Sequence, residues 1–163
     1  MNVVFYFAAA VAVVATAMVV TRPNAVHALL YLIVSLAAVA IVFFTLGAAF
    51  VAALEVIVYA GAILVLFLFV LMLLNQGPEA AGLERDWLRP TYWVGPAVLA
   101  AALLGLLLYM LALGGLGNVG TGPIEPRAVG AALFGPYILG VELASMLLLA
   151  AIVGAYHLGR RRG

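Results

Sequence analysis

One apolar stretch constrains this chain more than any other feature, the run FVAALEVIVYAGAILVLFLFVLMLLN over residues 50–75. It carries a single charged residue, Glu55. As an α-helix its 26 residues would reach about 39 Å, beyond the roughly 30 Å hydrocarbon core of a bilayer. A carboxylate near the bilayer centre costs about 2.5–3.5 kcal/mol on insertion scales. We therefore expect Glu55 to face protein or water rather than lipid.

The rest of the chain repeats this apolar character. Of its 163 residues, 69% are hydrophobic and only 8% are charged, which is more apolar surface than a soluble domain of this size could bury. The sequence therefore predicts an all-α polytopic membrane protein forming a single transmembrane domain over residues 1–163. The five predicted transmembrane helices cover about 2–21, 26–46, 50–75, 91–113 and 136–158.

Helix-breaking residues separate these spans. Arg22-Pro23-Asn24 ends the first, Gly47 marks a tight turn after the second, and Pro78 prevents the third from continuing. A polar loop is expected up to residue 90. Residues 114–134 are too rich in glycine and proline for a stable helix over most of their length.

The arginines predict the orientation of the five spans. With the N-terminus outside, six of the seven arginines lie on the inner side and only Arg127 lies outside, which fits the positive-inside rule. The C-terminus is then cytoplasmic, and Tyr92 and Trp93 lie at the inner interface.

Two acidic residues lie inside predicted spans, Glu55 and Glu142. In this orientation the third and fifth helices run in the same direction, and both carboxylates lie on the order of 8–10 Å below the outer end. They could share a hydrated cavity as proton carriers, because ionisable residues within membranes often mark proton paths. The alternative is a protonated carboxyl hydrogen-bonded to a neighbouring helix, and Ser145 offers Glu142 a local partner.

Tyr59 and Gly61 are the other candidate site residues of the third helix. Tyr59 follows Glu55 by one helical turn, and its hydroxyl, near the bilayer middle, requires a partner. Gly61 and its alanine neighbours permit close helix approach, and glycine lowers the cost of leaving ideal helical geometry. From the residues alone, ordinary packing is the favoured interpretation of both, and a weak point in the helix is the alternative.

Several classes of chemistry find no support in the sequence. It contains no nucleotide-binding loop, catalytic triad or pair of haem-binding histidines. Cysteine is absent, which excludes disulfides and thiolate ligation of metals or iron–sulfur clusters. The basic run Arg160–Arg162 is typical of a topology anchor and gives no basis for nucleic-acid binding.

Three segments carry a resemblance to a known family. LEVIVYAGAILVLFLFVLMLLN at 54–75 closely resembles the third helix of membrane subunit J of bacterial proton-pumping NADH:quinone oxidoreductase, respiratory complex I, whose mitochondrial counterpart is the sixth ND subunit. VELASMLLLAAIVGAYHL at 141–158 is similar to the fifth helix of that family, and RPNAVHALLYLIVSLAAVA at 22–40 to the entry of its second.

The resemblance implies a place in the membrane arm of that complex, packed with the A, H, K and N chains and with lipid, in the bacterial inner membrane. It implies no catalytic residue, metal or cofactor in this chain, whereas the whole complex uses NADH, FMN, iron–sulfur clusters and quinone.

The resemblance also implies that the third helix can hold a π-bulge around Tyr59–Gly61. Conversion of the bulge to regular α-helix would rotate the inner half of the helix and open or close a water path from the quinone side. Tyr59 and Gly61 carry over by motif as gating residues, and Glu55 and Glu142 match acidic positions of the family.

Three functions remain open at this point. The chain can be a gating and coupling subunit, a scaffold without a role in proton transfer, or a free-standing small transporter. The first predicts that Gly61→Val disturbs proton pumping in an assembled complex, the second that Glu55→Gln and Tyr59→Phe are silent, and the third that the chain transports alone.

Overall fold

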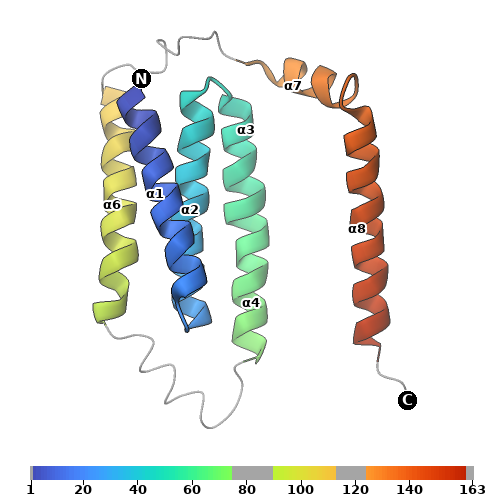
Figure 1. Cartoon of the computed structure of the whole chain (residues 1–163), viewed down its shortest axis with the longest axis horizontal. Helices are drawn as coiled ribbons and strands as arrows, with labels where there is room; N and C mark the ends of the chain where they lie inside the picture. Colours follow the sequence, from blue (N-terminus) through green and yellow to red (C-terminus); the bar gives the residue numbers. More distant parts are fainter. Residues whose placement is uncertain (1, 75–89, 113–123, 161–163) are drawn as a thin grey trace. The chain divides into compact units, whose positions relative to one another are not determined.

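The protein is all helical in the part of the chain that the computed structural model describes, residues 2–74, 90–112 and 124–160 (Figure 1). The chain divides into two compact units, Met1–Pro123 and Ile124–Gly163. The prediction of one transmembrane domain over residues 1–163 stays a prediction. Among the described residues, five helices are long and apolar enough to cross a membrane, which confirms the predicted all-α polytopic class: Val3–Thr21, Ala25–Thr45, Ala49–Leu74, Tyr92–Ala112 and Ile138–Gly159.

The first unit begins with a helical hairpin. Helix α1 (Asn2–Thr21) ends where Pro23 removes a backbone donor, and α2 (Ala25–Thr45) follows at once. Asn24 caps α2, because its side-chain oxygen accepts hydrogen bonds from the amides of Val26 and His27 at 2.9 and 3.4 Å. The predicted break at Arg22-Pro23-Asn24 is therefore present and carries its own cap.

A tight turn joins α2 to the third span. Gly47 has φ 83°, in the left-handed region that glycine adopts without steric cost. The Thr45 hydroxyl donates to the Val42 carbonyl at 2.7 Å and closes the last turn of α2. The third span then comprises three pieces: helix α3 (Ala49–Leu54), the π-helical segment η1 (Glu55–Ile63) and helix α4 (Leu64–Leu74).

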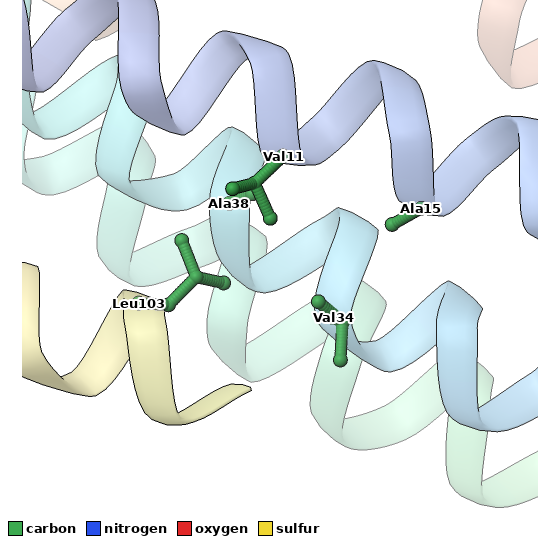
Figure 2. Packing of buried hydrophobic residues seen from close by; sticks show 5 residues of the cluster. All are labelled: Val11, Ala15, Val34, Ala38 and Leu103. Atoms are coloured by element: carbon green, nitrogen blue, oxygen red, sulfur yellow. The ribbon is translucent and has the colours of Figure 1, made fainter. Parts of the chain in front are cut away.

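Helix α2 is the centre of the first unit, since it packs against α1, against all three pieces of the third span and against helix α6 (Pro90–Ala112) (Figure 1). The core where α1, α2 and α6 meet consists of small and β-branched side chains, with one leucine from α6 (Figure 2). Its buried members are Val11, Ala15, Val34, Ala38 and Leu103. Ala15 and Ala38 are completely buried, so the backbones of α1 and α2 approach closely, as small residues allow in membranes.

A polar contact also joins α1 to α2. The hydroxyls of Thr16 and Ser35 lie 2.8 Å apart, and the Ser35 hydroxyl lies 3.3 Å from the Ala12 carbonyl. Ser35 is buried, so this contact satisfies a polar group that would otherwise be desolvated without a partner.

The second unit holds helix α7 (Pro126–Leu133) and helix α8 (Ile138–Gly159). Residues 114–134 were predicted to be largely non-helical, and the eight-residue helix α7 within that range was not expected. The helix starts with Pro126, in the first turn, where the missing N–H of proline has no helical partner to lose. Within the second unit no residue of α8 is buried, and only Val141 and Gly154 are partly covered.

Candidate functional site

The third span changes its hydrogen-bond register in the middle. The backbone amide of Glu55 donates to the Val51 carbonyl four residues earlier, as in an α-helix. The amide of Leu64 is shared between the carbonyls of Gly61 and Tyr59, and its bond to Tyr59 spans five residues. The intervening segment η1, Glu55–Ile63, is π-helical, and such segments are frequent at functional sites. The predicted π-bulge around Tyr59–Gly61 is confirmed, within a longer segment than expected.

Gly61 lies within this segment, close to the backbone of the preceding turn. A Cβ atom placed on Gly61 would come within 3.2 Å of the Val56 carbonyl oxygen, five residues earlier. That is closer than ordinary van der Waals contact, so a side chain at this position would require the backbone to shift. Glycine at residue 61 therefore favours the π register.

Three of the four predicted site residues share this segment. Glu55 is its first residue and is half-buried, while Tyr59 is about half exposed. Among the described residues, none forms an ion pair or hydrogen bond with the Glu55 carboxylate or the Tyr59 hydroxyl. Both groups therefore remain available to water or to a neighbouring chain.

Glu142, the fourth predicted residue, lies in α8 of the second unit and is exposed. Ser145, suggested above as its local partner, instead donates its hydroxyl proton to the Val141 carbonyl at 2.9 Å. A hydrated cavity shared by Glu55 and Glu142 stays a prediction, because the two belong to different units.

The helices on either side of η1, α3 and α4, differ in how much of their surface is buried within the first unit. Ala52 of α3 is buried, and α3 follows directly on the Gly47 turn. In α4 only Leu64 is buried, and large side chains such as Phe67 and Phe69 are more than half exposed. A rotation of α4 about its axis would therefore break few contacts within this chain.

The described residues contain no group of three or more histidine, cysteine, aspartate or glutamate side chains that could hold a metal ion. The whole sequence lacks cysteine. The chain therefore offers no thiolate ligand for an iron–sulfur cluster.

Known proteins match almost the whole chain. The family described as NADH-ubiquinone/plastoquinone oxidoreductase chain 6 matches residues 15–158. The NADH-quinone oxidoreductase subunit J of Pseudomonas aeruginosa is 59% identical over 162 residues, 99% of this chain and 98% of the relative. The subunit of the same name from Escherichia coli K12 is 55% identical over 98% of this chain and 87% of its own length. That of Buchnera aphidicola subsp. Schizaphis graminum is 44% identical over 99% of both chains.

The matches agree with the resemblance drawn from the three segments of the sequence. The described residues include five helices long and apolar enough to cross a membrane, and bacterial relatives match 98–99% of the chain, so it is a multi-pass protein of the bacterial inner membrane. It belongs to the NADH-ubiquinone/plastoquinone oxidoreductase chain 6 family.

Proposed function

We propose that the chain is a membrane-arm subunit of proton-translocating NADH:quinone oxidoreductase that couples quinone-site chemistry to proton movement through its third span. The π-helical segment η1 is the observation that carries this proposal. The chain supplies no redox centre, and the NADH, FMN, iron–sulfur clusters and quinone of the complex bind to other subunits. The neighbours we propose are the A, H, K and N chains.

The switch consists of a change of backbone register. Each α-helical residue advances the helix by about 100°, so removing the extra residue of a π segment rotates everything beyond it by about that angle. Because α3 packs against α2 and stays in place, α4 is the part that rotates. Its bulky side chains, Phe67 and Phe69 among them, would move to new positions and close or clear a water path.

Glu55 and Tyr59 are proposed as the groups that use this path. Glu55 lies at the fixed end of η1 and Tyr59 in its middle, so a register change alters the position of the phenol relative to the carboxylate. A carboxylate at this depth is costly unless it contacts water or a partner, which favours a hydrated neighbour for Glu55. Glu142 is proposed as a second acidic group of the same path.

Two substitutions of Gly61 test the switch in the intact, purified complex. Gly61→Ala should disfavour the π register by about 1 kcal/mol, a roughly fivefold shift in population, because its Cβ meets the Val56 carbonyl. Gly61→Val should act in the same direction and more strongly, because its side chain is β-branched. The ratio of protons translocated to NADH oxidised, measured in proteoliposomes, should fall from wild type to alanine to valine.

The matched controls are Gly105→Ala and Gly105→Val in α6, where an added Cβ meets no atom within 4 Å. They should leave the proton ratio unchanged. A normal ratio in an assembled Gly61→Val complex would leave a scaffold role as the better account.

A further inference from the structure

A polar cavity of about 210 Å³ lies in the first unit, away from η1. It is bordered by the α1–α2 connection and the N-terminal ends of α2 and α6. Its lining residues are Arg22, His27, Tyr31, Tyr92, Val94 and Gly95.

The cavity carries a positive charge that no described carboxylate neutralises. The Arg22 guanidinium carbon lies 5.4 Å from the centre of the Tyr31 ring, and one of its nitrogens lies 3.5 Å from the Met18 sulfur. Neither contact supplies a negative charge. Arg22 therefore keeps its capacity to bind an anion through paired N–H groups.

The walls around this charge are preformed. His27 and Tyr31 are buried, with 6% and 5% of their surfaces exposed. The His27 ring stacks on the Tyr92 ring with centroids 4.5 Å apart and planes inclined by 27°. Gly95 leaves room for the Tyr31 hydroxyl, because a Cβ atom at that position would overlap it. Rigid aromatic walls of this kind lower the ordering cost of binding.

The position of the cavity identifies the environment of its ligand. Arg22 directly follows the span Val3–Thr21, and Tyr92 is the first residue of the span Tyr92–Ala112. The cavity therefore lies where membrane meets water, at the level of lipid headgroups. Its volume is below the roughly 300–1,000 Å³ of sites for drug-sized ligands, so it suits a headgroup fragment. Basic pockets between transmembrane helices are known to bind anionic headgroups.

We propose that this cavity binds the phosphate group of an anionic phospholipid. The Arg22 guanidinium pairs with two phosphate oxygens, since its planar fork matches phosphate geometry. Tyr31 and Tyr92 line the cavity, so we propose their hydroxyls as donors to the headgroup, and the buried His27 ring stacks on Tyr92. The proposal does not depend on the switch in η1.

The test uses the intact complex in nanodiscs and phosphatidylglycerol with a photoreactive group in its headgroup. Cross-linked peptides are mapped by mass spectrometry. Wild type should be labelled within residues 22–31 and 92–95, and unlabelled phosphatidylglycerol should compete where phosphatidylcholine does not. If inorganic phosphate does not compete with the probe, the ligand is the phosphate group of a lipid, as proposed. If inorganic phosphate competes as well as phosphatidylglycerol does, the ligand is soluble phosphate and the lipid proposal is wrong.

Variants assign the labelling to the cavity. Arg22→Gln should reduce it about tenfold to a hundredfold at low probe concentration, because a hydrogen bond to a charged group contributes about 1.5–3 kcal/mol and each step of about 1.4 kcal/mol is tenfold. Arg22→Lys should retain part of it. Gly95→Ala should reduce it by displacing the Tyr31 hydroxyl, and Gly105→Ala in the same helix should not. Equal labelling of wild type and Arg22→Gln, or labelling confined to other segments, would overturn the proposal.

Discussion

The amide of Leu64 donates to the carbonyl of Tyr59, five residues earlier in the third span. Nine residues before Leu64, the amide of Glu55 still bonds four residues back, to Val51. Between these two amides the helix therefore contains one residue more than a regular α-helix would have. The excess coincides with Gly61, the position where a side chain would press on the backbone.

Replacing Tyr59 by phenylalanine should slow proton translocation and leave assembly unchanged. The change removes only a hydroxyl, and one hydrogen bond from it to water or a neighbouring chain would contribute about 0.5–1.5 kcal/mol, so the rate should fall roughly twofold to tenfold. The measurement is the initial rate of proton uptake by proteoliposomes that contain the purified complex. Tyr109→Phe in α6, also an exposed tyrosine, is the matched control and should have no effect. Identical rates for the two variants would support the scaffold account.

Replacing Glu55 by glutamine should reduce proton translocation more than Tyr59→Phe does. Glutamine preserves the shape of the side chain and cannot carry a proton, so its effect separates proton transfer from packing. The same change at Glu142 tests whether the acid in α8 serves the same path. The ratio of protons moved to NADH oxidised should fall in both variants, and in the double variant by no more than in the worse single one. Additive losses would place the two acids on separate paths.

The α1–α2 contact should be intolerant of larger residues. Ala15 is completely buried in the core, so Ala15→Leu should destabilise the hairpin by about 1–3 kcal/mol through overpacking. The amount of this chain retained in the complex after mild heating measures the effect. Ala17 lies two residues away in α1 and is exposed, and Ala17→Leu should be retained as wild type. Retention of both variants would contradict the packing described for this core.

The turn before the third span should require glycine. Gly47 has φ 83°, and a residue with a Cβ in that region costs about 1–2 kcal/mol. Gly47→Ala should therefore lower the steady-state level of the chain in membranes, as judged by quantitative immunoblotting. Gly105→Ala provides the comparison, since no atom lies within 4 Å of its added Cβ. A Gly47→Ala level equal to that of Gly105→Ala would show that the turn does not limit stability.

The sequence predicted the spans and most of their ends because these follow from apolar length and from local breakers. Pro23 and Gly47 act within a few residues of themselves, so their effects are readable without tertiary contacts. The short helix α7 was missed, although Pro126 at its start is a recognisable first-turn signal. Gly130 within this helix, and the glycines and prolines that precede it in residues 114–134, favoured a loop interpretation.

The π segment and the polar contacts were harder to predict from the residues. Tyr59 and Gly61 alone favoured ordinary packing, and only the resemblance to a family indicated a π-bulge. The Thr16–Ser35 contact and the stacked rings of His27 and Tyr92 join residues 19 and 65 positions apart. Such contacts depend on how helices pack, which local pattern does not specify.

The most direct test of the coupling account is the partner of the Leu64 amide in the intact complex, determined by electron cryomicroscopy in the resting state and during turnover. The account predicts two populations. In one, Leu64 donates to Tyr59 as in the structure described above, and in the other it donates to Ala60, with α4 rotated by about 100°. A Leu64–Tyr59 bond in every particle class under both conditions, with α4 unmoved, would contradict it.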